Sequence, residues 1–126
     1  MRSLPGVVQM IVRVCGVVQI VLGLLFWFGV ARGLVNLHML VGIVLVLSVW
    51  SLCVLAAINR VPPVLPAVGF LLGLLVVWLG LNQTSLLPGG AHWVIQVLHL
   101  LVGVSAIGFS EMLAGRIKAI GARAAA

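Results

Sequence analysis

Four long apolar runs constrain this chain more than any other feature of its sequence. They cover roughly residues 7–30, 34–59, 64–81 and 91–115. A helix needs about 20 predominantly apolar residues to cross a hydrocarbon core of ~30 Å. Strands of a membrane barrel would instead alternate apolar and polar residues over about 10 positions, which these runs do not do. The sequence therefore predicts four transmembrane helices.

The runs occupy most of the 126 residues, of which 64% are hydrophobic and 6% charged. The segments between them carry residues that stop helices: Arg32-Gly33, Pro62-Pro63, and Asn82 to Gly90. Connections this short make consecutive helices antiparallel. We therefore expect one all-α membrane domain over residues 1–126, an antiparallel four-helix bundle followed by a basic C-terminal tail at 116–126.

Lys and Arg residues are distributed unevenly between the two ends of this bundle. Arg32 is alone at one end, and five basic residues belong to the other: Arg2, Arg60, Arg116, Lys118 and Arg123. Because basic residues concentrate on the cytoplasmic side of membrane helices, we expect a multi-pass protein of the cell inner membrane with both termini cytoplasmic. The charge indicates topology and attraction of the tail to anionic headgroups, and does not indicate a nucleic-acid partner.

Glu111 is the only acidic residue, and it falls inside the fourth apolar run. Arg13 falls at a comparable depth in the first run, which neighbours the fourth in an antiparallel bundle. An unpaired charge inside a membrane is costly. We therefore expect an ion pair between Arg13 and Glu111, the alternative being that Arg13 extends to the headgroups.

The two halves of the chain resemble each other, with a helical hairpin as the repeated unit. "VLGLLFWFG" at residues 21–29 matches "LLGLLVVWLG" at 71–80, and "LHMLVG" at 37–42 matches "LHLLVG" at 98–103. Two parallel copies of a hairpin generate a pseudo-twofold axis along the membrane normal. The second and fourth helices then lie diagonally across the bundle, and His38 and His99 become symmetry mates.

His38 and His99 differ somewhat in predicted depth. His38 lies about four residues inside the second run and His99 about eight inside the fourth, a mismatch of ~6 Å at a rise of 1.5 Å per residue. A modest vertical offset between the helices removes it. The spacing therefore permits the two imidazoles to meet.

A histidine inside a membrane normally faces the bundle interior and marks a functional site. Two facing imidazoles can bind one metal ion from opposite sides, as axial ligands hold haem iron. A flat macrocycle between helices needs room, which glycine provides. We expect His38 and His99 to bind the metal and four glycines to line the cofactor: Gly23, Gly42, Gly73 and Gly103. Close helix packing in lipid is the alternative role of such small residues.

Two further polar residues precede His99 on the fourth helix. His92 lies two turns before it, so both project from nearly the same face. His92 can bind a propionate or handle a proton, or it is an interfacial side chain wetted by headgroups. Gln96 lies one turn before His99 and can orient its ring, as hydrogen-bonding neighbours do for metal-bound histidines, or bond another helix.

The topology and the two histidine motifs resemble the four-helix b-type cytochromes of membranes, in particular one half of haem A synthase. In that family, histidines near the outer ends of the second and fourth helices bind a haem, which implies that His38 and His99 hold one haem b per chain. The synthase has a glutamate three residues before its first histidine, where this chain has Val35, and an outer cysteine pair absent here. The resemblance therefore implies electron transfer rather than haem-modifying catalysis.

Two main functions stay open on the sequence, with a small transporter or a single-ligand pigment site as a third possibility. The first is a b-type cytochrome with one haem near the outer face, exchanging electrons with a quinone or an outer-side redox protein, since the inner half contains no histidine. The second is a cofactor-free structural or assembly subunit whose histidines make interhelical hydrogen bonds. The lipid bilayer is a partner in both, and both are compatible with a homo-oligomer or a larger membrane complex.

Cysteine labelling tests the predicted orientation. In a background lacking Cys15 and Cys53, a cysteine at Ala125 should be labelled only from the cytoplasmic side, and a cysteine at Ser85 only from outside, because the basic residues hold the termini inside. Labelling of Ala125→Cys by an impermeant outside reagent would contradict the orientation.

Overall fold

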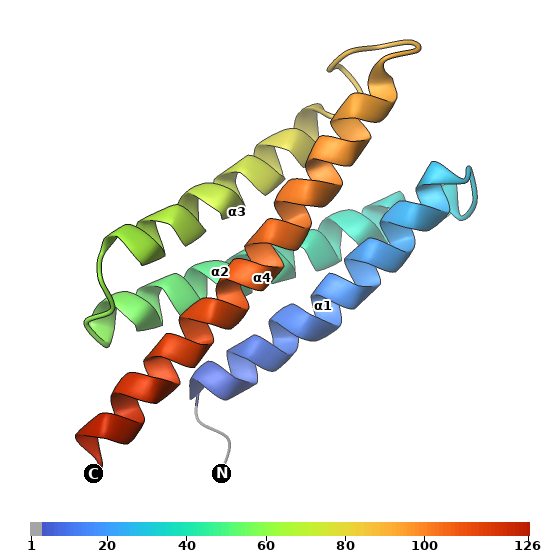
Figure 1. The fold of residues 1–126 in the computed structure, drawn as a ribbon. Helices are drawn as coiled ribbons and strands as arrows, with labels where there is room; N and C mark the ends of the chain where they lie inside the picture. The colour runs from blue at the N-terminus through green and yellow to red at the C-terminus, as the bar shows by residue number, and fades with distance from the viewer. Residues whose placement is uncertain (1–3) are drawn as a thin grey trace.

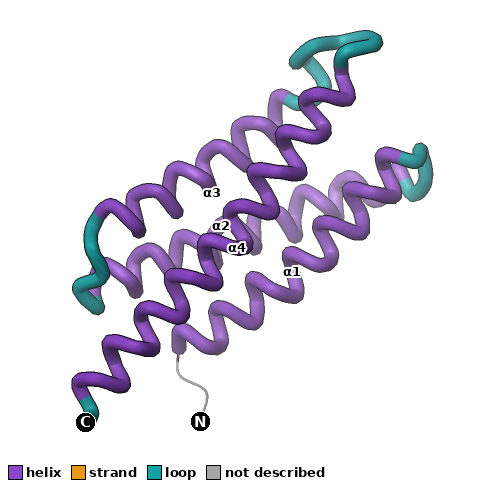
Figure 2. Tube along the Cα trace, in the orientation of Figure 1, coloured by secondary structure: helices purple, strands orange, loops and turns teal. Residues whose placement is uncertain are grey.

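A computed structural model of the chain describes residues 4–126. Its long helices are α1 (Leu4–Trp27), α2 (Val35–Ile58), α3 (Val64–Asn82) and α4 (His92–Ala124), with one turn of 3-10 helix, η1 (Arg32–Leu34), before α2 (Figures 1 and 2). The described residues contain no strand. Four helices are long and apolar enough to cross a membrane, so the predicted all-α class with four membrane-spanning helices is confirmed.

The helix bounds differ from the prediction at both ends of the chain. α1 is already helical at Leu4, and α4 continues to Ala124 through the segment predicted as a tail. At 1.5 Å per residue, the 33 residues of α4 span about 50 Å, roughly 20 Å more than a hydrocarbon core. The basic residues of segment 116–126 therefore lie on a continuous helix that extends beyond the core.

The chain runs up and down the bundle, so its two ends differ (Figure 1). We call the end with the two termini and the α2–α3 connection the terminal end, and the end with the α1–α2 and α3–α4 connections the hairpin end. α2 and α4 contact each other, while α1 and α3 each contact both of them but, within residues 4–126, not one another. The diagonal pair expected from the repeat therefore forms the centre of the bundle.

α2 ends in a turn dictated by its last residues. Arg60 takes a left-handed φ of 57°, and the amide of the next residue, Val61, donates to the helix carbonyl five residues back at 3.0 Å. This arrangement closes many helix C-termini, and Pro62 cannot continue the helix because it lacks an N–H. α1 ends in the same way, with Gly29 at the left-handed position with φ of 75°.

The packed core lies toward the terminal end. Its buried members come from α1, α2, the α2–α3 connection and α4: Val8, Val12, Leu45, Val49, Leu52, Cys53, Ala56, Val61, Leu113, Ala114 and Ile117. Toward the hairpin end the buried apolar side chains are fewer, namely Leu22, Leu79 and Ile95. The bundle is therefore more tightly packed at the terminal end than at the hairpin end.

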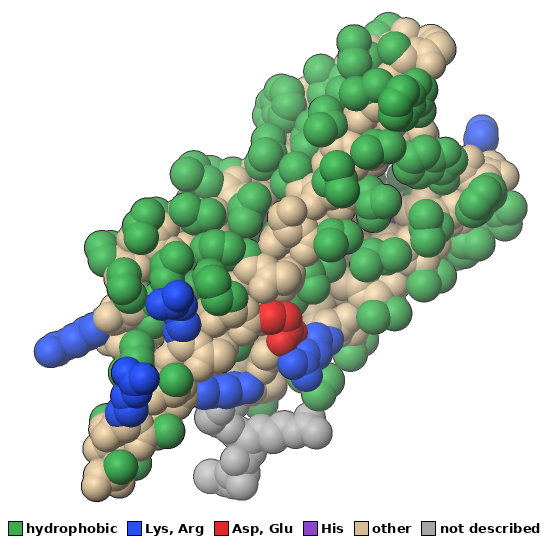
Figure 3. Space-filling view, in the orientation of Figure 1, with side chains coloured by type: hydrophobic (Ala, Val, Ile, Leu, Met, Phe, Trp, Pro, Cys, Tyr) green, Lys and Arg blue, Asp and Glu red, His purple; other side chains and the backbone are tan. Residues whose placement is uncertain are grey.

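The α1–α4 contact contains the ion pair expected from the sequence. Arg13 Nε donates to Glu111 Oε1 at 2.8 Å and Arg13 Nη2 donates to Oε2 at 2.7 Å. Gln9 donates to the same carboxylate and accepts a hydrogen bond from Lys118. Figure 3 shows the carboxylate at the surface among basic side chains. Bidentate arginine–carboxylate pairs are strong, and this one joins the first helix to the last.

Trp50 of α2 packs closely against α3. Its Nε1 donates to the carbonyl oxygen of Phe70 at 3.2 Å, and its ring stacks on Phe70 with centroids 4.7 Å apart. A Cβ built at Gly73 would lie 2.3 Å from Trp50 Nε1. Because Gly73 has no side chain, the indole ring of Trp50 can pack directly against the backbone of α3.

Gly73→Ala should lower the free energy of unfolding by about 1–3 kcal/mol, since an added methyl group meets a rigid indole in a packed contact. Reversible unfolding in mixed micelles measures the change. Gly108→Ala is the matched control, because nothing lies within 4 Å of a Cβ built there, and it should leave stability unchanged or raise it by up to about 1 kcal/mol, since Ala favours a helix over Gly. Equal losses in the two variants would refute the packing role.

Candidate metal centre

His38 on α2 and His99 on α4 lie side by side in the hairpin half of the bundle. Their ring centroids are 6.5 Å apart, with an angle of 53° between the ring planes. Both side chains are half-buried. α2 begins at Val35 and α4 at His92, so His99 lies farther from the start of its helix than His38 does. A shift of the two helices along the bundle axis compensates for this difference and brings the two rings to the same level. The structure thus brings together the two histidines that the internal repeat singles out.

The ring separation distinguishes two arrangements of an imidazole pair. A direct hydrogen bond, with nitrogens at most 3.2 Å apart, would hold the centroids within about 5.6 Å. One metal ion bound from opposite sides, with metal–nitrogen bonds of about 2.0–2.1 Å, would hold them about 6.4 Å apart. The observed 6.5 Å is too long for the hydrogen bond and suits a shared ion.

Each imidazole also has a buried nitrogen with no hydrogen-bond partner among the described residues, Nδ1 of His38 and Nδ1 of His99. The side-chain oxygen of Gln19, on α1, is a third buried atom of this kind. Leaving such an atom unpaired costs roughly 1–3 kcal/mol, and a bilayer core offers no water as a substitute. These three residues therefore have polar capacity that the protein itself does not use.

α1 and α3 shape the surroundings of the pair. Phe26 packs edge-on against His38, with centroids 5.3 Å apart and an interplanar angle of 69°. A Cβ built at Gly23 of α1 would lie 3.9 Å from His38 Cε1, and one built at Gly80 of α3 would lie 3.3 Å from His99 Cε1. Each imidazole therefore rests against a glycine of the preceding helix, and both hairpins repeat this contact.

The glycine beside His99 is not the one that the sequence repeat suggests. Matching the two halves pairs Gly23 with Gly73, but the structure places Gly80 against His99 and Gly73 against Trp50. The connection before α4 is longer than the connection before α2, so the contact with His99 falls nearer the end of α3. Gly73 lies two turns, about 10 Å, farther from the hairpin end, and it is not brought to the pair.

Gly42 and Gly103 each lie one turn beyond a histidine, but the space beside them differs. A Cβ built at Gly42 would lie 2.5 Å from Gln19 Nε2, so this amide occupies the space there. Nothing lies within 4 Å of a Cβ built at Gly103. Gln19 is thus a polar neighbour of this region that pattern matching overlooks. Its only signal in the sequence is that it is an amide side chain deep in an apolar run, a property it shares with Gln9.

His92 and Gln96 make no hydrogen bond to the pair within the described residues. His92 Nδ1 lies 3.2 Å from the carbonyl oxygen of Leu86, so Nδ1 is the donor of this hydrogen bond. This bond ties the α3–α4 loop to the first residue of α4. Gln96 is half-buried and does not hold His99 Nδ1, which lacks a partner.

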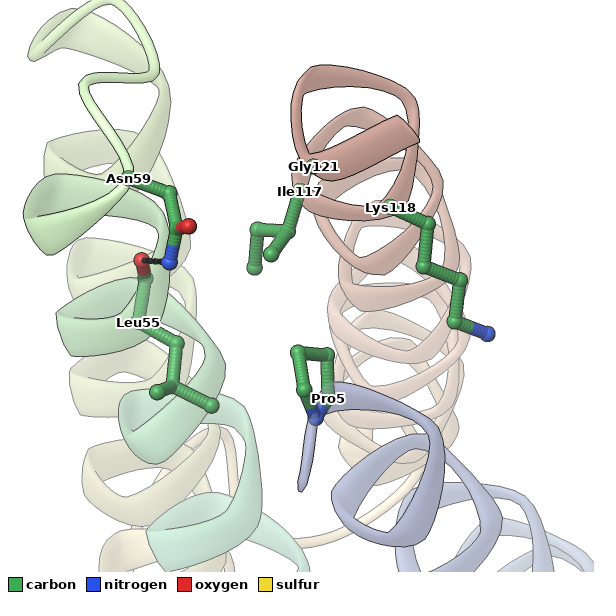
Figure 4. Close-up of a pocket in the computed structure, with 6 residues that line it drawn as sticks. All are labelled: Pro5, Leu55, Asn59, Ile117, Lys118 and Gly121. Carbon is green, nitrogen blue, oxygen red and sulfur yellow. Dashed lines mark hydrogen bonds between the residues drawn. The ribbon is translucent and has the colours of Figure 1, made fainter. Parts of the chain in front are cut away.

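The pair is a two-donor site. Residues 4–126 contain no group of three or more His, Cys, Asp or Glu side chains that could hold an ion. Neither of the two best-formed surface hollows of residues 4–126 is lined by a histidine. One lies at the terminal end between α1, α2 and α4 (Figure 4), and the other on α3 at Leu71, Leu74, Leu75 and Trp78.

Comparisons with protein-family models, with curated proteins and with solved structures found no match. The fold and the site therefore define the class on their own. It is a multi-pass α-helical membrane protein with a histidine pair between the two central helices of its bundle.

Proposed function

We propose that this chain is a small membrane b-type cytochrome in which His38 and His99 are the axial ligands of one haem b. The observation that carries the proposal is the pair itself, with ring centroids 6.5 Å apart and two unpartnered nitrogens between contacting helices. Haem iron takes four ligands from its own macrocycle and its axial ligands from the protein. Two imidazoles without a third donor fit this requirement.

The packing around the pair supports room for a planar group. The tightly packed core lies at the opposite end of the bundle, and Gly103, one turn from His99, faces open space. Phe26 and the backbone at Gly23 and Gly80 provide an apolar surround for the rings. The haem would therefore lie in the hairpin half, on the side of the pair that Gly103 leaves open.

A bound haem would supply a one-electron couple. His38 and His99 would hold its iron through neutral imidazole nitrogens, and their helices would keep the rings in place and water away. Phe26 packs against His38, and the two imidazoles lie beside each other. The resemblance to one half of haem A synthase supports the same ligands, while Val35 stands where its glutamate would be.

We place the pair near the outer face of the cell inner membrane, with both termini cytoplasmic. The charge distribution supports this orientation. Arg32 is at the hairpin end, and four basic residues are at the described terminal end: Arg60, Arg116, Lys118 and Arg123. Arg2, counted with them in the sequence, lies outside the described residues. A quinone or a redox protein would then exchange electrons on the outer side.

His92 is the candidate for the accompanying proton in this proposal. It begins α4 at the hairpin end, and its Nε2 is the ring nitrogen not engaged by Leu86. The cofactor-free assembly subunit has less support, because it rests on hydrogen bonds between helices that neither His38 nor His99 makes among the described residues.

His38→Ala and His99→Ala should each abolish the low-spin haem spectrum of the purified protein, since either change removes an axial ligand. Optical spectra of the oxidised and reduced forms, with haem per chain measured chemically, report the result. His92→Ala is the control and should retain full haem content, because its ring nitrogen bonds the loop carbonyl of Leu86. Wild-type protein without haem, or both variants retaining the low-spin spectrum, would refute the proposal.

Gly103→Leu should lower haem content severalfold while leaving helix content and thermal stability near the wild-type values. A Cβ built there has no neighbouring heavy atom within 4 Å, so the added side chain extends into the open space proposed for the macrocycle. The readouts are haem per chain and circular dichroism. Undiminished haem content would place the macrocycle elsewhere around the pair.

A further inference from the structure

Gln19 is a polar residue of α1 to which the proposed function gives no role. Its side-chain oxygen is buried, and among the side chains of residues 4–126 it is the one buried acceptor oxygen without a hydrogen-bond partner. An unpaired polar atom in a bilayer core is costly, because no water replaces the missing partner. Gln19 therefore has an acceptor to offer to a neighbouring donor.

Gln19 and His38 belong to one group of four residues on the contacting helices α1 and α2. Gly23 comes one turn after Gln19, and a Cβ built at Gly23 would lie 3.9 Å from His38 Cε1. Gly42 comes one turn after His38, and a Cβ built at Gly42 would lie 2.5 Å from Gln19 Nε2. Because Cβ atoms one helical turn apart are separated by about 5–6 Å, the amide lies within about one turn of the imidazole.

The amide and the imidazole are chemically complementary. A neutral imidazole that binds a metal through one nitrogen carries its proton on the other, and this N–H is a donor. Metal-binding histidines almost always donate it to an acceptor in the protein or to water. His38 Nδ1 is buried and has no partner among the described residues. The pair thus combines a donor that needs an acceptor with an acceptor that needs a donor.

We infer that Gln19 is the positioning residue of His38, an inference that rests on the proposed function. Its side-chain oxygen accepts a hydrogen bond from the ring nitrogen of His38 that does not bind the iron. This bond is not made in the present structure, and rotation about the side-chain bonds of Gln19 forms it. It fixes the orientation of the ring and raises its basicity. A more basic imidazole favours ferric over ferrous iron, so Gln19 lowers the reduction potential.

The other histidine of the pair, His99, has no such residue on α3. Gly80 lies against His99, just as Gly23 lies against the first histidine. Gln19 comes one turn before Gly23, whereas Val76 comes one turn before Gly80 and has no polar side-chain atom. The amide therefore serves one ligand of the pair, and the two axial ligands differ in basicity.

Gln19→Leu in the haem-loaded protein removes the acceptor. Ferric haem should transfer to excess apomyoglobin about tenfold faster, as expected when a hydrogen-bonding neighbour of a metal ligand is lost. The midpoint potential should rise, by about 59 mV if the tenfold loss falls on the ferric form alone. Gln19→Met, which is unbranched and lacks the oxygen, should behave in the same way, so the result does not depend on the folding of one variant.

Two further variants separate positioning from packing. Gln19→Glu keeps an acceptor oxygen and should hold the potential at or below the wild-type value. Val76→Leu changes the equivalent place beside His99 and should alter neither the potential nor the rate of haem transfer.

An unchanged potential in haem-loaded Gln19→Leu or Gln19→Met would overturn the inference and leave the proposed function intact. Equal shifts in Gln19→Leu and Val76→Leu would do the same, since they would show a general effect of packing. A Gln19→Glu variant with the raised potential of Gln19→Leu would also overturn it. Wild-type protein without haem would overturn the proposed function and this inference together.

Discussion

The lack of water in a bilayer core is the constraint on which the rest of this structure depends. Each polar group there needs a partner within the protein. The backbone meets this need in helices, and Ser48 and Ser110 donate to carbonyls of their own helix. Arg13 and Glu111 neutralise each other across α1 and α4. The unpartnered Nδ1 atoms of His38 and His99 are an exception to this pattern, and the proposed haem site rests on them.

The two ends of the bundle differ in how tightly their side chains are packed. At the terminal end the buried cluster and the Arg13–Glu111 pair hold the helices together. At the hairpin end there are fewer buried side chains and there is open space at Gly103. The proposed haem site would lie in the less filled half, with His38 and His99 held on helices that the packed half fixes in place.

The helices, the ion pair and the proximity of the two histidines could be predicted from the sequence, because each follows from a local or repeated sequence pattern. Apolar length predicts the helices, and the scarcity of charge leaves Arg13 and Glu111 as each other's natural partners. The repeated motif points to His38 and His99 as neighbours. The glycine that contacts His99 could not be predicted in this way, since the third helix contains both Gly73 and Gly80. Which one reaches His99 depends on loop length and on how α3 sits against α4.

The sequence by itself determined the number of helices, their antiparallel order and the pairing of the only acidic side chain, because these follow from hydrophobicity and charge. Only the tertiary structure decided the 6.5 Å between the imidazoles, the contact of Trp50 with Gly73, and the position of the Gln19 amide beside Gly42. Such features depend on the rotation and offset of each helix against its neighbours. Runs that are apolar all round leave that rotation unspecified, so side-chain packing between distant segments sets it.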